Sequence, residues 1–204
     1  MKIVLLGATG KTGRELLKQA LDAGHHVTAL VRNPHRLASE HDNLRIVIGD
    51  ATDKEAVRSA MKGNDVLISA IGSANTSLIT KSTEAILLAS LGEPIERIVM
   101  LSSFAAKRAQ LKLAAKLLTG LIMKDIIRDK QNGETLLRRG HTSWTVVYAA
   151  RLTDEVDSKR KVRVLPLEEK IGLKNAIARK DVSRWILDEL DKKSYINKDV
   201  LISQ

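Results

Sequence analysis

Short apolar runs alternate along the chain with stretches in which apolar residues recur at helical spacing. Runs typical of buried parallel strands lie at residues 2–6, 26–31, 44–48, 65–71, 97–101 and 145–148. Helical spacing is found at residues 14–23, 53–61, 76–91, 107–139 and 181–190. Weaker patterns predict a short strand near 162–165 and a final edge strand at 200–203. Strands that alternate with helices predict an α/β fold: a Rossmann-like, doubly wound, mostly parallel sheet of six to seven strands with helices on both faces.

Two regions depart from this regular alternation. Gly120 and the pair Asn132-Gly133 weaken the long helical stretch 107–139, so we expect a break or kink there. Residues 151–179 are irregular, and we expect them to form an excursion on the substrate side of the sheet. Because no linker or internal repeat interrupts the pattern, residues 1–204 are expected to form a single domain.

The composition excludes several kinds of site. The chain has no cysteine, which excludes disulfides, thiolate metal sites and cysteine nucleophiles. Its five histidines lack the spacing of metal ligands, so no metal site is predicted. No stretch approaches the roughly 20 apolar residues of a membrane span, and the N-terminal apolar run is too short for a signal peptide. We therefore expect a cytoplasmic protein without a membrane partner.

The formal net charge is +10, which favours nucleic acid, an anionic membrane surface or an anionic small molecule as a partner. The basic residues are mostly dispersed along the chain, however. The densest cluster is Lys159, Arg160, Lys161 and Arg163, which we interpret as a solvated loop or a lid that faces an anion. Nucleic acid is the less favoured interpretation.

A glycine-rich turn follows the first predicted strand and opens the first helix. Its glycines, Gly7, Gly10 and Gly13, have the spacing G-x-x-G-x-x-G. Glycine tolerates positive φ in the turn, lets the backbone approach a pyrophosphate and lets the helix pack on the sheet, while the helix N-terminus attracts phosphate. The alternative is a structural turn without a ligand; a P-loop needs a different spacing. We predict that a dinucleotide contacts Gly7, Thr9, Gly10, Lys11, Thr12 and Gly13.

The end of the second strand indicates which dinucleotide binds. A site for NAD usually carries Asp or Glu there, to bind the ribose 2′-hydroxyl. This chain carries Arg32 instead, with Arg36 close behind and no carboxylate nearby. We predict that the two arginines bind a 2′-phosphate, so that NADP(H) is preferred over NAD(H). Ordinary surface arginines are the alternative.

Residues at the carboxyl ends of later strands are expected to line the same site, because open α/β sheets bind ligands there. Asp50 either accepts a hydrogen bond from the adenine amino group or caps the next helix. Ser102 and Ser103 face the nicotinamide end or simply cap the following segment. The residues predicted to line the cofactor in this region are Asp50, Ala51, Ala70, Ile71, Gly72 and Ser102.

Together these motifs resemble the atypical short-chain dehydrogenase/reductase superfamily, in its NAD(P)H-binding, NmrA-like and flavin reductase (biliverdin reductase B-like) branch. The resemblance covers nearly the whole chain. It implies an NAD(P)-binding Rossmann domain; some members reduce flavins, quinones or similar molecules, and others are sensors without turnover. The motifs are GATGKTG, VRNPHRL, GDATD, ISAIGS, VMLSSFAA, WTVVYAARLTD and AIARKDVSRWILDEL.

The superfamily's usual catalytic pair, Tyr-x-x-x-Lys, is incomplete in this chain. Lys130 matches the lysine and has Glu134 four residues on, but Ile126 stands where the proton-donating tyrosine belongs. Carbonyl reduction by that pair is therefore disfavoured. Many relatives carry Arg-Pro after the sixth strand, where this chain has Tyr148-Ala149. Tyr148 either stacks on an acceptor or belongs to the core.

The leading hypothesis is an NADPH-dependent oxidoreductase that transfers hydride to a small planar acceptor: a flavin such as FMN, a quinone or a similar molecule. Hydride transfer to a flavin needs mainly stacking and orientation of two rings. The candidate catalytic residues are Ser102, Ser103, Lys130 and Tyr148. The alternative is a non-catalytic NADP(H)-binding redox sensor of the NmrA-like type, and an isomerase or epimerase ranks lowest. The sequence leaves a homodimer open.

Overall fold

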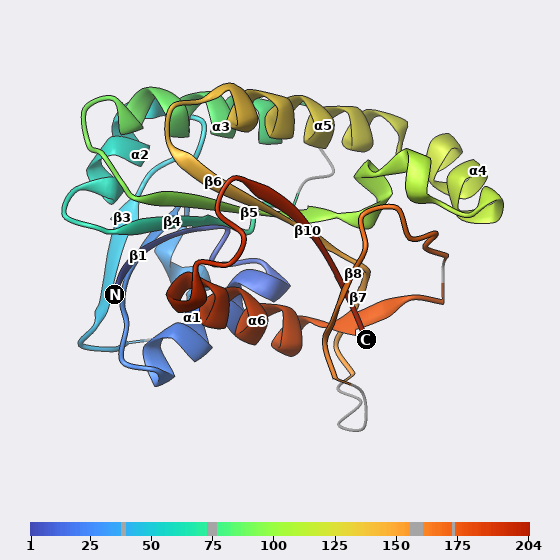
Figure 1. Ribbon diagram of the computed structural model, residues 1–204. Helices are drawn as coiled ribbons and strands as arrows, with labels where there is room; N and C mark the ends of the chain where they lie inside the picture. The colour runs from blue at the N-terminus through green and yellow to red at the C-terminus, as the bar shows by residue number, and fades with distance from the viewer. Residues whose placement is uncertain (38–39, 73–76, 156–160, 173) are drawn as a thin grey trace.

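An eight-stranded sheet runs through the centre of the molecule in the computed structural model, which describes residues 1–37, 40–72, 77–155, 161–172 and 174–204 (Figure 1). Its strand order is β3-β2-β1-β4-β5-β6-β10-β8, and every neighbouring pair is parallel except β10 and β8. In sequence order these strands are β1 (Lys2–Leu6), β2 (His26–Val31), β3 (Leu44–Ile48), β4 (Val66–Ser69), β5 (Arg97–Ser103), β6 (Ser143–Ala149), β8 (Arg163–Leu165) and β10 (Lys198–Ser203). The predicted doubly wound fold is confirmed.

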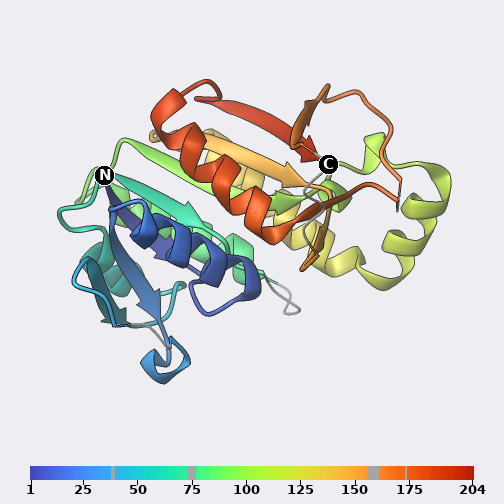
Figure 2. The same cartoon turned by 90° about the horizontal axis from the view of Figure 1, so that it is seen from below.

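Helices cover both faces of the sheet (Figures 1 and 2). One face carries α2 (Lys54–Met61), α3 (Leu78–Ser90) and α5 (Lys124–Arg139), and the other carries α1 (Lys11–Asp22) and α6 (Arg179–Lys192). A shorter helix, α4 (Leu113–Ile122), lies at the end of the molecule where the strands terminate. Single 3-10 turns are η1 (Pro34–Arg36), η2 (Phe104–Ala106) and η3 (Arg108–Gln110).

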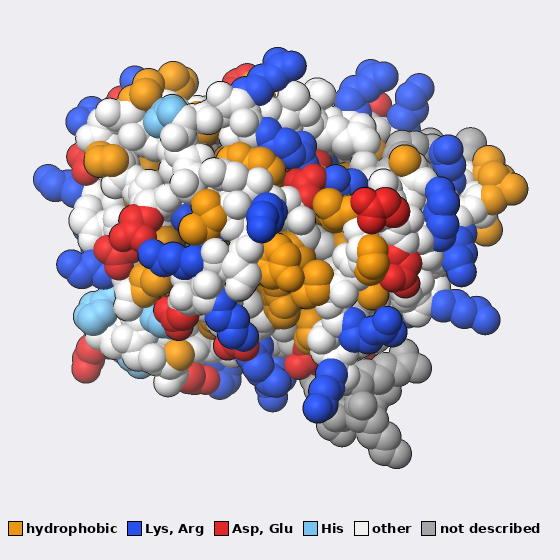
Figure 3. All heavy atoms as spheres, viewed as in Figure 1, with side chains coloured by type: hydrophobic (Ala, Val, Ile, Leu, Met, Phe, Trp, Pro, Cys, Tyr) orange, Lys and Arg blue, Asp and Glu red, His pale blue; other side chains and the backbone are white. Residues whose placement is uncertain are grey.

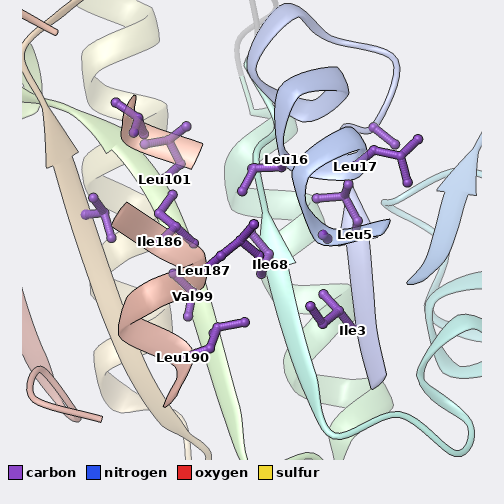
Figure 4. Close-up of a cluster of buried hydrophobic side chains, with 14 of the residues drawn as sticks. Ile3, Leu5, Leu16, Leu17, Ile68, Val99, Leu101, Ile186, Leu187 and Leu190 are labelled. Carbon is purple, nitrogen blue, oxygen red and sulfur yellow. The ribbon is translucent and has the colours of Figure 1, made fainter. Parts of the chain in front are cut away.

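The alternation of side chains along each strand divides the core into two layers. Ile3 and Leu5 of β1 pack toward α1 and α6, whereas Val4 and Leu6 pack toward the opposite helices. Figure 4 shows the first layer, in which Leu16 of α1 points toward the sheet. Both faces of β1 are buried from Ile3 to Leu6, which is why these four residues are all apolar.

The sheet differs from the prediction at one edge. The strand β10 was expected at the edge, but it lies between β6 and β8 and pairs parallel with β6. The short strand β8 forms the edge instead and runs antiparallel to β10. Two further strands, β7 (Arg151–Thr153) and β9 (Ala176–Ala178), form a separate parallel pair. The excursion at 151–179 therefore contains short strands that its irregular sequence did not indicate.

The expected break in the long helical stretch is present, but neither glycine causes it. The chain breaks at Met123, between α4 and α5, while Gly133 lies inside α5. A Cβ on Gly133 would be only 2.8 Å from Cγ2 of Ile79 and 3.1 Å from Oγ1 of Thr83. Gly133 therefore allows α5 to pack closely on α3, a constraint that only the tertiary contact reveals.

On the face of the molecule that Figure 3 shows, Lys and Arg side chains are scattered among acidic and apolar ones. Lys159 and Arg160 of the basic cluster lie outside the described residues, whereas Lys161 and Arg163 are inside them. Within the described part of the chain, no helix is long and apolar enough to cross a membrane.

One ion pair is buried where β5 meets α6. The Arg97 and Glu189 side chains are only 5% and 4% exposed, and their charged atoms Nη1 and Oε1 are 3.6 Å apart. Arg97 Nη2 also donates to the Glu189 backbone oxygen at 2.9 Å. Burial lowers the pKa of Arg97, and the Glu189 carboxylate opposes that effect. Arg97 therefore depends on Glu189 for charge balance.

Glu189→Ala should lower the free energy of unfolding by about 3 kcal/mol, because it leaves a buried guanidinium without its counter-charge. The matched control is Glu96→Ala, which removes the exposed partner of Lys193 and should cost less than about 1 kcal/mol. Urea unfolding followed by circular dichroism measures both. Equal losses in the two variants would contradict the importance of the buried pair.

Candidate functional site

The strand order reverses between β1 and β4, and a crevice opens where their carboxyl ends diverge. Gly7, directly after β1, has φ +82, and a Cβ there would be 2.7 Å from the Ala70 carbonyl oxygen. Its own carbonyl oxygen accepts from Gly10 N at 2.9 Å. A Cβ on Gly13 would be 2.0 Å from that same oxygen. Only glycine at positions 7 and 13 fits this turn.

The glycine turn aims the N-terminus of α1 into the crevice. Gly10 is the N-cap residue of α1 and provides no side-chain cap. The first turn of a helix has N–H groups without intrahelical partners, and these favour a phosphate. A Cβ on Gly10 would meet only the Gly7 oxygen, at 3.3 Å. The space above Gly10 is thus open on the side where the prediction places a pyrophosphate.

A cavity of about 260 Å³ occupies this crevice. Ten of the residues predicted to contact the cofactor line it: Gly7, Thr9, Gly10, Arg32, Arg36, Asp50, Ala51, Ala70, Ile71 and Gly72. Four residues without a predicted role also line it, namely Leu30, Val31, Gly49 and Leu78. The first three lie one or two residues before Arg32 or Asp50, so their position at the strand ends was the available indication.

Four predicted cofactor residues do not line this cavity. Thr12 and Gly13 are buried beneath the turn, so they support it. Lys11 points elsewhere, with Nζ 3.0 Å from Oδ2 of Asp154. Ser102 lies at a second cavity.

Asp50 and Arg32 face each other at the edge of the first cavity. Oδ2 of Asp50 is 4.0 Å from Nη1 of Arg32. Oδ1 of Asp50 accepts from the Thr52 backbone N–H at 2.9 Å and from its hydroxyl at 2.8 Å. These hydrogen bonds lower the pKa of Asp50. The helix cap is Asp53, which accepts from Glu55 N, so the capping alternative for Asp50 is wrong.

The second cavity, which we call the acceptor pocket, has a volume of about 420 Å³ and lies at the carboxyl ends of β5 and β6. Its walls are mainly apolar, with contributions from α4 and from the excursion. The lining residues are Ser102, Ser103, Phe104, Ala105, Thr119, Met123, Ala149, Ala150, Arg151, Leu152 and Arg179. A concave, mostly apolar pocket of this size fits a small planar molecule.

Asp154 connects the glycine turn with the acceptor pocket. Its Oδ1 is 2.5 Å from Nη1 of Arg179, which lines the pocket, and its Oδ2 is 3.0 Å from Nζ of Lys11. The hydrogen bond from Lys11 is the largest of the effects that lower the pKa of Asp154. Residues from the glycine turn, the excursion and the start of α6 are thereby held together at one place.

Beneath the acceptor pocket lies a buried polar network, which we call the Glu134 network. Ser102 Oγ donates to Oε1 of Glu134 at 2.6 Å, and the Tyr148 hydroxyl donates to Oε2 at 2.5 Å. Arg138 Nη2 donates to the Tyr148 oxygen at 2.7 Å and to Oδ1 of Asp199 at 2.9 Å. In the sequence, Glu134 is distinguished only by its position four residues beyond Lys130, which predicts no role for it.

Tyr148 does not line the acceptor pocket. Its side chain is 0% exposed, and Lys107 Nζ lies 4.6 Å from its ring centre. Burial, with the nearby Glu134 carboxylate, raises the pKa of Tyr148 far above its usual range. The stacking role is therefore wrong for this structure, because the ring has no face toward a ligand.

Of the other candidate catalytic residues, Ser103 lies at the acceptor pocket and Lys130 does not. Lys130 is half-buried and lines neither cavity. Burial lowers the pKa of Lys130, although Glu134 and Asp129 oppose this. Ser103 lines the acceptor pocket, and its Oγ accepts from Ala105 N at 3.3 Å, so it also caps η2.

The family model described as NAD(P)H-binding matches residues 7–193. The chain belongs to this NAD(P)H-binding family. The match begins at the first glycine of the turn and spans both cavities.

Sequence similarity to several individual curated proteins covers only part of this chain. It is 39% identical to the uncharacterized protein YwnB of Bacillus subtilis over 74 residues, which are 36% of this chain and 33% of that protein. The first curated relatives are thus matched over about a third of their length or less.

Solved structures share the fold over the whole chain. A short-chain dehydrogenase/reductase of Veillonella parvula in complex with NADP has a TM-score of 0.87 at 16% identity, over 100% of this chain and 94% of that one. The anaerobillin reductase ChuY of Escherichia coli O157:H7 has a TM-score of 0.83 at 20% identity, over 99% and 96%. At these identities the likeness shows the fold alone.

Gly10→Ala and Gly13→Ala should separate ligand binding from folding in this NAD(P)H-binding protein. Gly10→Ala should fold normally but lose at least about tenfold in affinity for NADPH, because the methyl group occupies the approach of a pyrophosphate. Gly13→Ala should lower the thermal midpoint, because its methyl group collides with the Gly7 carbonyl. Thermal unfolding and titration by NADPH fluorescence measure the two effects. Normal NADPH binding by Gly10→Ala would contradict the predicted pyrophosphate site.

Proposed function

We propose that this protein is an NADPH-dependent reductase that transfers hydride to a small planar acceptor such as a flavin. The observation that carries the proposal is the pairing of two cavities at the carboxyl end of one sheet. One is the glycine-lined crevice, and the other is the apolar acceptor pocket. Membership of the NAD(P)H-binding family supports the first half of this assignment.

The residues around the crevice fit a dinucleotide. The open space above Gly10 and the N-terminus of α1 form a cradle for phosphate. When bound, the nicotinamide supplies a hydride, which carries two electrons to N5 of a flavin, and water supplies the proton that completes the reduced flavin. The chain itself has to bind the two rings and orient them toward each other.

The positions that match the superfamily's Tyr-x-x-x-Lys pair do not provide its proton donor. Ile126 stands at the position of the proton-donating tyrosine, and it has no proton to give. Tyr148 is enclosed in the core, where its hydroxyl already donates to Glu134. A flavin-type acceptor needs no such donor from the protein, because a water molecule suffices to protonate its reduced ring. The missing tyrosine therefore favours a planar acceptor over an alcohol or ketone.

The preference for NADPH rests on Arg32 and Arg36. Both line the crevice, and the Arg32 side chain is 76% exposed, so it is accessible to a ligand. A guanidinium binds a phosphate through charge-assisted hydrogen bonds. Asp50, the nearest carboxylate, already accepts two hydrogen bonds from Thr52. These contacts support binding of a 2′-phosphate rather than a 2′-hydroxyl.

Arg32→Ala should weaken NADPH binding by about tenfold and leave NADH binding within about twofold, because only NADPH carries the 2′-phosphate. The control is Arg128→Ala, which removes an exposed positive charge from α5, away from the crevice. Fluorescence titration with both nucleotides gives the affinities. A parallel loss for NADPH and NADH would refute the 2′-phosphate assignment.

The reductase itself is tested by mixing the protein with NADPH and FMN and following the absorbance of the reduced nicotinamide at 340 nm. Protein-dependent oxidation with NADPH, and much slower oxidation with NADH, is the expected result. Tight NADPH binding without oxidation of NADPH by FMN or menadione would instead support the NADP(H)-binding redox sensor.

A further inference from the structure

The hydroxyl of Ser102 has only one hydrogen, and the structure shows where that hydrogen goes. Ser102 Oγ donates to Oε1 of Glu134 at 2.6 Å, and both side chains are buried, at 4% and 3% exposure. Ser102 also lines the acceptor pocket. A serine hydroxyl that donates in one direction offers only lone pairs in every other direction.

The surroundings of Glu134 keep this direction fixed. The second carboxylate oxygen accepts from the Tyr148 hydroxyl and lies 3.5 Å from Nη2 of Arg138. Because burial and the Glu134 charge raise the pKa of Tyr148, the phenol keeps its proton and continues to donate. The Glu134 carboxylate thus accepts from a serine hydroxyl through one oxygen and from a phenol through the other, with a guanidinium beside the second oxygen.

We propose that Glu134 positions Ser102 as a hydrogen-bond acceptor, so that the acceptor pocket selects a planar heterocycle with a ring N–H over a quinone. The isoalloxazine ring of an oxidised flavin carries one such group, N3–H. A quinone presents only carbonyl oxygens, whose lone pairs would face those of Ser102. This inference rests on the proposed function and narrows its substrate class; Glu134 acts as a positioning residue.

The same contact reinforces the case against carbonyl reduction. A serine beside the reacting carbonyl is useful there only if its hydroxyl donates to the carbonyl oxygen. Here Glu134 takes that hydrogen, and Ile126 replaces the tyrosine that would provide another. Two separate features of the chain thus disfavour an acceptor that reacts through a carbonyl oxygen.

The test compares binding of lumiflavin, 3-methyllumiflavin and menadione to the protein saturated with NADP⁺. Lumiflavin and its methyl derivative differ only at N3, where an N–H becomes N–CH₃. The wild-type protein should bind lumiflavin about tenfold more tightly than either other molecule, because an unpaired lone pair in a buried site costs about one hydrogen bond. Equilibrium dialysis gives all three dissociation constants without any turnover.

Two variants separate the hydrogen bond from the shape of the pocket. Ser102→Ala should bind the two flavins equally, within about twofold, because the group that accepts from N3–H is gone. If the methyl group were rejected for its size, Ser102→Ala would still reject it. Glu134→Gln should shift the preference toward menadione, because an amide that donates to Ser102 releases the serine hydrogen toward the pocket.

Asp129→Asn is the matched control for Glu134→Gln. Asp129 is a buried carboxylate on the same helix, but it accepts from Ile79 N and Thr80 N and does not contact Ser102. It should keep the wild-type preference even where thermal unfolding shows a loss of stability. If Glu134→Gln acted only by destabilising α5, Asp129→Asn would change the preference for lumiflavin over menadione in the same way.

The proposal is overturned if the wild-type protein binds the two flavins equally, prefers menadione, or binds none of the three. It is also overturned if Glu134→Gln leaves the preference unchanged. The reductase hypothesis is judged separately, by oxidation of NADPH with FMN. Selective lumiflavin binding without oxidation would refute the reductase and leave the role of Glu134 intact, whereas oxidation with equal flavin and menadione affinities would do the reverse.

Discussion

The close approach of backbone to backbone at the glycine turn is the constraint on which the site depends. The Gly7 carbonyl oxygen accepts from Gly10 N and lies where a Cβ of Gly13 would be, while Gly7 itself lies against the Ala70 carbonyl. These contacts fix how α1 leaves β1 and how both meet β4. The direction of the α1 N-terminus, and hence the position of the crevice, therefore depends on backbone contacts that leave no space for a Cβ atom at Gly7 or Gly13.

The acceptor pocket depends on a different kind of interaction. Ser102, Glu134, Tyr148, Arg138 and Asp199 form a connected set of hydrogen bonds between β5, α5, β6 and β10. In a buried network each donor and acceptor needs a partner, so the direction of every hydrogen bond is set by the others. The pocket therefore has a defined polarity at Ser102, in addition to its apolar walls.

The excursion connects these two regions. Asp154 pairs with Lys11 of the glycine turn and with Arg179 of the acceptor pocket. An exposed ion pair contributes little to stability, so the importance of Asp154 lies in where it places the two cations. Arg151 and Leu152 from the same segment form part of the pocket wall. An irregular segment thus completes a site that begins at the first strand.

The sequence by itself determined the parallel core of the sheet and most of the residues that line the crevice. The apolar runs at 2–6 and 65–71 predicted the buried parallel strands β1 and β4, and the spacing of Gly7, Gly10 and Gly13 predicted the turn, because these properties depend on local composition and spacing. Arg32, Asp50 and Gly72 all line one crevice, since the carboxyl ends of neighbouring parallel strands meet at the same edge of a sheet.

Only the tertiary structure decided the roles of Tyr148, Lys11 and Glu134. Their partners lie 14, 143 and 32 positions away along the chain, for Tyr148 with Glu134, Lys11 with Asp154 and Glu134 with Ser102. Pattern and spacing describe which face of an element is apolar, but they do not say which polar group another element brings opposite. The direction of a hydrogen bond is set by that pairing, and so it became visible only when the chain was folded.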